Sequence, residues 1–437
     1  QTIFQSKDVT SNYQFLSGSP KKFEGEVKAP VFPGIYATWK KNKLAVSFGF
    51  NPVGGGGGAE FKKGLPSFEE SIADLVPSLQ SSLAPLDIAL SNAPPFGYGF
   101  DPHFRNVTGY TADIYFKGTS VFFGYQLGVT YKINDMIGVY AGARYVTAKN
   151  TYTGHIRDVM IDASPTVPES FYSIPAGSYT PGDYMRTVAG APGIPGTTAA
   201  TLNGTAAYLD VATGDREVDV EETGSGFAPI LGANISIGEN LNIGLKYEFK
   251  TKLDLTQSVN DGKSGGIFVE DSTIHSDMPA MASVGVSYKI FPKLSAQVGF
   301  HYYFDRSANY GKTLDAEPTV PVDNDKVIDQ DYFEVALGLE YNITEKLIVS
   351  GGYLLAHTGV SEDYQSDLSF SLTSSTFGLG LGYRINDNLM VNLGGAYSKY
   401  KDGEKNRAHL LGANEVPVKD TYFKDNIFFG IGVDISF

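Results

Sequence analysis

Cysteine is absent from this chain of 437 residues, and tryptophan occurs only once. The lack of cysteine excludes disulfides, thiolate metal sites and cysteine nucleophiles, but it leaves the cellular compartment open. No apolar run reaches the ~18 residues that a membrane-spanning helix needs. Positive charge is also scarce. The 34 Lys and Arg face 48 Asp and Glu, and the net charge of -14 argues against nucleic acid as a partner.

Glycine, tyrosine and phenylalanine are instead abundant, with 50, 27 and 28 residues. The segment Phe377–Lys399 shows how they are used. Leu379 and Leu381 alternate with Gly378 and Gly380, and the alternation resumes after a short polar turn. This period of two predicts a hairpin with one apolar face and one small or polar face.

Six short polar turns of this kind recur, and each separates two strands with the same alternation. They are Lys40–Asn42, Asn134–Asp135, Gly238–Asn240, Pro292–Lys293, Thr344–Glu345 and Asn386–Asp387. The six hairpins supply twelve strands, and Thr2–Phe15 and Phe423–Phe437 are predicted as the first and the last strand. The sequence therefore predicts fourteen antiparallel strands, an even number as in single-chain bacterial barrels.

The small-residue face carries charges that neither lipid nor a dry core accepts. The charges singled out as lining a wet lumen are Arg144, Lys246, Glu248, Glu334, Glu340 and Arg384. They are interpreted as a mutually paired network, with attraction of a ligand carboxylate by Arg144, Lys246 or Arg384 as the alternative. We expect an all-β fold, a single transmembrane β-barrel over residues 1–437 in a bacterial outer membrane, rather than a soluble β-sandwich.

The connections between hairpins are longer than the turns, especially 52–110 and 150–226, which we assign to the extracellular side. In the first connection, Ser67 and Glu70 form a capping box that predicts a short helix. Apolar residues on one helical face, with two aromatic neighbours, are candidates for binding a hydrophobic ligand. They are Phe50, Phe68, Ile72, Leu75, Val76, Leu79, Leu83 and Phe96. The alternative is a lid that packs on its own loops.

A run of five glycines follows the strand Leu44–Phe50. Proline and glycine sustain neither regular pairing nor side-chain cover, so an opening in the barrel wall is predicted here. The residues assigned to this lateral opening are Gly49, Asn51, Pro52, Gly54, Gly55, Gly56, Gly57 and Gly58. The run lacks the lysine and the helix of a phosphate loop, and a flexible hinge is the alternative.

Histidine offers no catalytic or metal site in the sequence. The six histidines are scattered without metal-ligand spacing, and no local motif places a nucleophile beside a base. We therefore expect no enzyme activity, no metal and no cofactor.

The order of turns and loops, the glycine-rich break after the third strand, the helical loop that follows and the terminal Phe437 together resemble the FadL/TodX family. Val31–Phe61 is the most family-like stretch. The resemblance implies an outer-membrane channel for long-chain fatty acids and other hydrophobic compounds, with ligand exit through the wall. The family's N-terminal hatch, which includes an Asn-Pro-Ala motif, is not seen ahead of Gln1, so its gating role is carried over to no residue here.

The predicted function is uptake of hydrophobic molecules, fatty acid-like or hydrocarbon, by passive lateral diffusion through the wall. Lateral exit spares an apolar ligand the water-filled lumen. A general porin for small hydrophilic solutes and a structural or adhesive barrel are the alternatives. The expected partners are the hydrophobic ligand and outer-membrane lipid, with no nucleic acid, and the barrel is expected to be a monomer.

Overall fold

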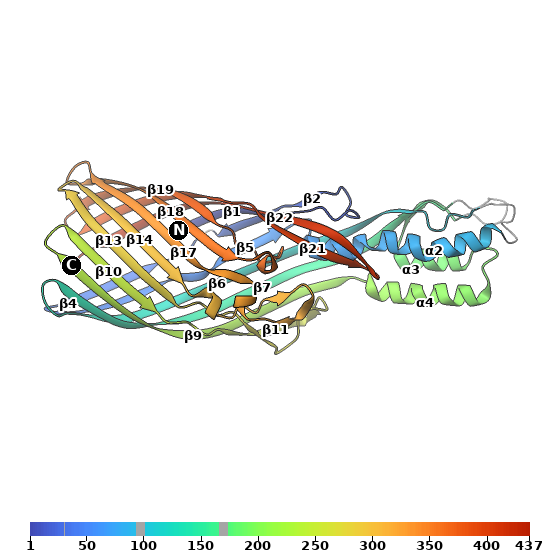
Figure 1. Cartoon of the computed structure of the whole chain (residues 1–437), viewed down its shortest axis with the longest axis horizontal. Coiled ribbons are helices and arrows are strands. Elements are labelled where there is room, and N and C mark those ends of the chain that lie inside the picture. The colour runs from blue at the N-terminus through green and yellow to red at the C-terminus, as the bar shows by residue number, and fades with distance from the viewer. Residues whose placement is uncertain (30, 93–100, 166–173) are drawn as a thin grey trace.

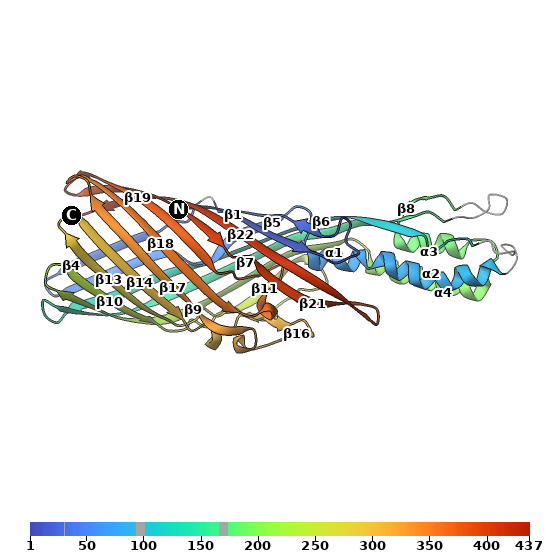
Figure 2. The same ribbon diagram turned by 45° about the horizontal axis from the view of Figure 1, so that its top comes forward.

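The computed structural model describes residues 1–29, 31–92, 101–165 and 174–437. It is an elongated β-barrel from which a group of helices projects at one end (Figures 1 and 2). The C-terminus lies near the opposite end of the barrel (Figure 1). Among the described residues, no helix is long and apolar enough to cross a membrane.

In the described part of the chain, twenty strands belong to one sheet. They are β1 (Thr2–Ser11), β2 (Lys21–Phe23), β3 (Gly25–Ala29), β4 (Ile35–Lys41), β5 (Leu44–Phe61), β6 (Val107–Lys132), β7 (Ile137–Ala163), β8 (Gly177–Tyr179), β9 (Arg216–Ile237), β10 (Leu241–Glu248), β11 (Asp254–Ser264), β12 (Thr273–His275), β13 (Met281–Phe291), β14 (Leu294–Tyr303), β17 (Ile328–Asn342), β18 (Leu347–Val360), β19 (Ser374–Asn386), β20 (Leu389–Tyr400), β21 (Gly403–Leu411) and β22 (Asn414–Ile435). A separate small sheet consists of β15 (Thr313–Leu314) and β16 (Glu317–Pro321).

The large sheet closes where β1 pairs antiparallel with β22, from Thr2 opposite Phe429 to Ser11 opposite Asp420. Four positions of the wall consist of consecutive short strands, namely β2–β3–β4, β10–β11, β12–β13 and β20–β21, and β8 only adds to the end of β7. The described wall therefore has fourteen antiparallel positions, which confirms the predicted number. Closure satisfies backbone groups for which lipid offers no partner.

Each of the six predicted turns joins two neighbouring strands of the wall. Asn42 and Gly238 adopt positive φ angles of 53° and 60°, as tight turns require. In another turn, Asn134 Oδ1 accepts hydrogen bonds from the backbone N–H groups of Met136 and Ile137 at 2.9 and 2.8 Å. Local side-chain chemistry thus fixes the register of the hairpins.

The wall is apolar outside and small or polar inside. On β19, Phe377 and Leu379 are 60% and 77% exposed on the outer face, whereas Gly378 and Gly380 line the lumen. Similar exposed residues on neighbouring strands form a continuous apolar exterior, which suits lipid and would be a liability in water. The alternation read from the sequence is therefore the lipid-to-lumen pattern of the barrel.

The strands extend further toward the helical end than predicted. β5 ends at Phe61 and β6 begins at Val107, so the connection runs from 62 to 106 instead of from 52 to 110. Likewise, β7 and β9 shorten the second connection to 164–215. The residues at these ends, which the sequence predicts as loops, continue the pairing among β5, β6, β7 and β9. This pairing provides hydrogen-bond partners for their backbone N–H and C=O groups.

Helices fill most of both connections. They are α1 (Pro66–Ala73), α2 (Leu75–Ser91), α3 (Pro181–Ala189) and α4 (Gly196–Ala212), and short 3-10 helices occur at η1 (Asp305–Ser307), η2 (Asn324–Lys326) and η3 (Glu362–Tyr364). The predicted helix in the first connection is α1 continued by α2, but it begins at Pro66 without a side-chain cap, so the predicted capping box of Ser67 and Glu70 is wrong. The helices α3 and α4 were not predicted. α4 is rich in Ala, Thr and Gly and shows no broad apolar stripe, whereas α3 has an apolar face with Tyr184, Met185 and Val188 but is only nine residues long.

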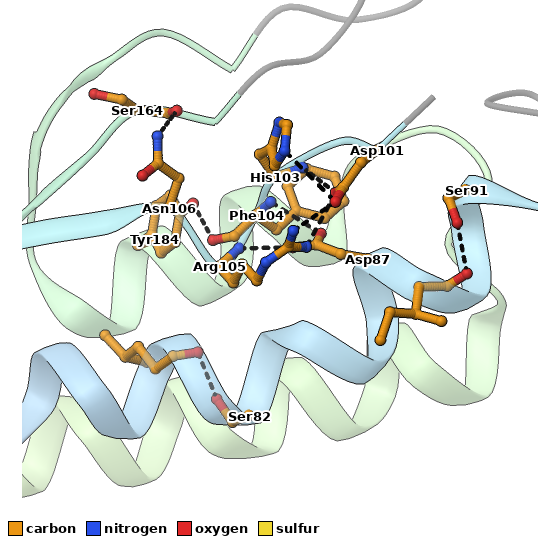
Figure 3. Close-up of polar contacts among 12 residues, drawn as sticks. Ser82, Asp87, Ser91, Asp101, His103, Phe104, Arg105, Asn106, Ser164 and Tyr184 are labelled. Atoms are coloured by element: carbon orange, nitrogen blue, oxygen red, sulfur yellow. Dashed lines mark hydrogen bonds and ion pairs between the residues drawn. The ribbon is translucent and has the colours of Figure 1, made fainter. Parts of the chain in front are cut away.

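The helices α2, α3 and α4 share a core at the projecting end, called here the tip core. Its buried members include Leu79, Leu83, Phe104, Ile161, Tyr184, Met185 and Leu209. Figure 3 shows the polar contacts beside it. The fully buried carboxylate of Asp87 accepts hydrogen bonds from the backbone N–H groups of Phe104 and Arg105 and from the Arg105 guanidinium, at 2.9, 3.0 and 2.9 Å. Tyr184 donates to the Phe104 carbonyl at 2.6 Å.

Candidate functional site

The regular pairing of the wall is interrupted at its second strand position, which consists of β2, β3 and β4. β3 pairs with β1 and with the end of β5. β4 pairs with the beginning of β5, up to Ile35 opposite Phe50. Residues 31–34 between them belong to no strand, so within the described chain β5 residues 51–58 have no partner in β3 or β4.

The glycine run continues β5 instead of ending it, which corrects the predicted end of the strand at Phe50. On its other side the run stays paired with β6, with register shifts between Pro52 and Gly57. Gly55 has a φ of +75°, and a Cβ atom there would lie 2.3 Å from the Ser120 carbonyl oxygen. Glycine is therefore required at this bulge. Pairing is lost on one side of the strand only.

A cavity of about 700 Å³ lies beside this interruption, and we call it the wall cavity. Its lining includes Phe32, Pro33, Gly34, Ile35, Tyr36, Asn51, Pro52, Val53, Gly54, Gly55, Ile431 and Val433. Five of the residues predicted to border a lateral opening lie beside this cavity. The cavity is lined directly by Asn51, Pro52, Gly54 and Gly55. Gly49 lies under the ring of Tyr36, and a Cβ atom placed at Gly49 would lie 3.4 Å from Tyr36 Cδ1.

A second cavity, of about 530 Å³, lies toward the helical end and is called here the upper cavity. Aromatic and aliphatic side chains make up much of its lining: Val27, Phe61, Phe68, Phe116, Tyr152, Ile267, Phe268, Ile274, Leu368 and Phe370. Gly56 and Gly58 belong to the same lining. The glycine run therefore borders both cavities, with Gly54 and Gly55 at the wall cavity and Gly56 and Gly58 at the upper cavity. Gly57, which is opposite Ser120 in β6, lies between Gly56 and Gly58 in the chain.

The lower lumen holds a third cavity, of about 720 Å³. Glycines from five neighbouring strands line it, together with Gln297, Glu340, Ser350 and Asn392. The glycines leave this part of the lumen wide because they carry no side chains. This cavity has a mixed polar and apolar lining, and it differs from the upper cavity in having only two aromatic residues, Phe428 and Phe429.

The predicted apolar stripe divides among different environments. Phe68 lines the upper cavity. Ile72 is buried where α1 packs at the barrel mouth, and Leu75 and Val76 pack against this core and the tip core. Leu79 and Leu83 are buried in the tip core, so they present no open groove. The lid interpretation therefore describes most of the stripe.

The two aromatic neighbours of the stripe have other positions. Phe50 stacks on Phe123 and Tyr125 with ring centroids 5.5 and 4.9 Å apart. It shares the outer face of β5 with the exposed Phe48, so it faces lipid. Phe96 lies outside the described residues.

Most of the predicted lumen charges are paired. Arg144 forms an ion pair with Glu248, and Lys246 reaches the same carboxylate at 3.2 Å. The Glu334 carboxylate accepts hydrogen bonds from Tyr332 and Tyr303 at 2.8 and 3.3 Å and contacts His301 at 3.2 Å, so both of its oxygens have partners. These contacts match the paired-network interpretation and leave Arg144 and Lys246 poorly placed to take a ligand carboxylate.

Two of the predicted charges stand apart from this network. Glu340 lines the lower lumen cavity. Arg384 is exposed near the end of β19 and makes no ion pair within the described chain.

A buried network at the barrel mouth was not predicted. Arg407 of β21 forms ion pairs with Glu70 of α1 and with Asp420, the latter at 2.7 Å, and His409 lies 2.8 Å from Asp74. Burial raises the pKa of the Glu70 carboxyl, and the Arg407 guanidinium opposes that rise. The network holds α1, and with it Phe68, over the upper cavity. The residues that α1 and β21 contribute to it are more than 300 residues apart, so no local sequence pattern reveals it.

A closed barrel with an apolar exterior, a polar lumen and internal cavities is the architecture of an outer-membrane transport protein. The sequence pattern of the family described as outer membrane protein transport protein (OMPP1/FadL/TodX) matches residues 89–437, and the chain belongs to this family. The family is one of transporters and not of enzymes, and it places the chain in the outer membrane. No curated protein matches the sequence.

Solved structures share the fold. A FadL homologue of Pseudomonas aeruginosa has a TM-score of 0.56 and 12% identity, covering 99% of this chain and 89% of its own. The toluene transporter TodX of P. putida has a TM-score of 0.50 and 13% identity, covering 100% of this chain and 90% of its own. At identities this low, the two structures show a shared fold and not a shared ligand.

Proposed function

We propose that this protein takes up hydrophobic molecules and releases them sideways into the outer leaflet. The observation that carries the proposal is the glycine run, which borders the upper cavity at Gly56 and Gly58 and the wall cavity at Gly54 and Gly55. A ligand that passes this run moves from an aromatic chamber to an interruption of the wall without crossing the lower lumen. The toluene transporter TodX, which shares the fold, supports a hydrophobic ligand.

The physical reason for this route is hydration. An apolar molecule gains ~25 cal/mol for each Å² removed from water, and the wet lower lumen would forfeit that gain. In our proposal, the helical end and the connections around 52–110 and 150–226 face outward. The ligand reaches the upper cavity past Phe68 and leaves beside Asn51 and Pro52. One closed barrel contains both cavities, so a monomer suffices, and outer-membrane lipid receives the ligand.

A general porin is the second candidate, because the wide lower lumen cavity suits small hydrophilic solutes. Liposomes that contain the purified protein distinguish the two functions. We expect faster transfer of 1-dodecanol, a neutral hydrophobic probe, into vesicles with the protein than into empty vesicles, and no swelling in sucrose. Rapid swelling in sucrose together with unchanged transfer of 1-dodecanol would favour the porin.

A further inference from the structure

The connection between β14 and β17, residues 304–327, is called here the strap. It leaves the wall at the helical end of the barrel and contains β15 and β16 (Figure 2). Its Asn309 carbonyl accepts a hydrogen bond from the Asp277 backbone N–H at 2.8 Å. The strap therefore braces the segment around β12, which contributes Ile274 to the lining of the upper cavity.

The strap also braces a second part of that lining. Lys312 Nζ donates to the carbonyls of Tyr364 and Ser369 at 3.1 and 3.4 Å, and it lies 3.9 Å from the ring centroid of Tyr364. Ser369 lines the upper cavity together with its neighbours Leu368 and Phe370. A movement of the strap would therefore free two separate stretches of the cavity lining.

Two carboxyl groups fasten the beginning of the strap to the wall, and we call this pair the clasp. They belong to Asp305 of η1 and Asp331 of β17. Each accepts a hydrogen bond from the backbone beside the other: Asp305 Oδ1 from Tyr332 N–H at 3.1 Å, and Asp331 Oδ1 from Arg306 N–H at 2.9 Å. This reciprocal arrangement brings the two side chains into hydrogen-bonding contact.

A hydrogen bond between these two groups requires a proton, because ionised carboxylates are acceptors only. Asp305 is 6% exposed, so water screens the pair poorly. In the described ranges, no lysine, arginine or histidine forms an ion pair with either group. Burial raises the pKa of Asp305 to about 7, with a further contribution from the hydrogen bond and the charge of Asp331.

The other polar groups around the clasp come from every element that packs on it. They are Tyr302 of β14, Arg306 of η1, Tyr310 of the strap, Asn324 of η2, Tyr364 of η3 and Asp277, which lies 3.5 Å from Lys250. The phenols are neutral in the acid range. Burial lowers the pKa of Lys312 to about 7, so this lysine is charged in the acid range and titrates above the window of the clasp.

Two histidines on neighbouring strands also titrate near neutral pH. His275 of β12 contacts Asp254 at 2.7 Å, and His301 of β14 contacts Glu334 at 3.2 Å. Neither contacts the clasp, and a variant of Asp305 leaves both histidines in place. Such a variant therefore separates the effect of the clasp from theirs.

We propose that Asp305 and Asp331 share one proton, and that loss of this proton to water releases the strap and opens the upper cavity as the pH rises from 5 to 7. The inference adds regulation to the proposed function, on which its consequence for transport rests. A released Asp305 has the ordinary pKa of ~3.9, so the closed strap binds more protons than the released one between that pH and about 7. Closure is therefore fully stable below pH ~3.9 and loses stability up to about pH 7, by at most ~10-fold in the opening constant for each pH unit.

Hydrogen exchange of the strap amides tests the clasp in the full chain in lipid nanodiscs, after correction for the intrinsic pH dependence of exchange. We expect protection of the strap to fall ~10- to 100-fold from pH 5 to pH 7. Asp305→Asn keeps an acceptor for Tyr332 N–H and offers Asp331 a permanent donor, so its strap should remain protected at both pH values. Asp323→Asn, which removes an exposed carboxylate of the same strap, is the matched control and should keep the native pH dependence.

Two results would overturn the clasp. One is a native strap with equal protection at pH 5 and pH 7. The other is an Asp305→Asn variant that keeps the full native pH dependence, which would assign the effect to His275 or His301. If Asp305→Asn does not fold, Asp331→Asn supplies the amide from the other side of the contact, and the same two results decide.

Transfer of 1-dodecanol into liposomes connects the clasp to transport, because this probe carries no charge at either pH. We expect the native chain to transfer it several-fold faster at pH 7 than at pH 5, and Asp305→Asn to be slow at both. Equal native rates at the two pH values would refute regulation by the strap, while the hydrophobic channel stands. No transfer above that of empty vesicles at either pH would refute the proposed function instead, and hydrogen exchange then decides the clasp by itself.

Discussion

Replacement of Gly56 by tryptophan should reduce transfer of a hydrophobic probe to roughly one tenth of the native rate or less. Nothing lies within 4 Å of a Cβ atom placed at Gly56, and its φ is outside the left-handed region, so a side chain fits there without backbone strain. An indole brings ~150–250 Å² of surface to the boundary between the upper and wall cavities. The tryptophan side chain would then fill the proposed ligand path along the glycine run.

Gly56→Ala is the matched control for this experiment, because a methyl group occupies the same open position without filling the passage. Both variants are first checked for a folded barrel by heat-modifiable electrophoretic mobility, and transfer of 1-dodecanol into liposomes is then measured. We expect the alanine variant to match the native chain. Native-like transfer by the tryptophan variant would show that the ligand does not pass the glycine run.

The barrel could be predicted from the sequence because its rules are local. A turn such as Asn386–Asp387 and the alternation on either side of it fix a hairpin without any distant contact. Repetition of that unit then gives the number of strands. The boundaries toward the helical end were less predictable, since β6 and β7 continue as a paired ribbon without a change in composition that marks the membrane surface.

The glycine run could be located but not fully described. Its composition indicates a disturbance of pairing, and the structure places Gly55 at a bulge where glycine is required. Which side of β5 loses its partner depends on β3 and β4. Pro33 and Gly34 mark the break between these two strands, but no local signal places that break opposite β5 residues 51–58. The register between strands is set by tertiary contacts, so it cannot be read from a single sequence.

The apolar stripe and the lumen charges show that periodicity predicts which face a residue lies on but not which residues it contacts. Alternation placed Arg144 and Glu248 on the correct face, but it could not reveal that they pair with each other across the lumen side of the wall. A helical stripe at Leu79 and Leu83 indicates a buried face without naming what covers it, and α3 and α4 come from a connection 100 residues away.

Asp87→Ala should loosen the projecting helices by about 3–5 kcal/mol, because it removes the acceptor for three donors in a buried site. The side chain is fully buried, and two of its donors are backbone N–H groups of the segment that leads from α2 into β6 (Figure 3). Without the carboxylate, Phe104 N–H and the Arg105 guanidinium lose their partner in a place that water does not reach. The barrel wall contains none of these contacts and should keep its stability.

Hydrogen exchange of the α2 and α3 amides measures this local opening, and we expect roughly 100- to 5,000-fold faster exchange there, with unchanged protection in β19 and β20. Asp101→Ala is the matched control. It removes the other carboxylate on Arg105, bonded at 2.6 Å, but its side chain is 27% exposed and water can replace it, so the cost should stay below ~1 kcal/mol. Equal exchange in both variants would mean that the tip core alone holds the helices. Unequal exchange means that a single buried carboxylate supports α2, and through its junction with α1 the position of Phe68 over the upper cavity.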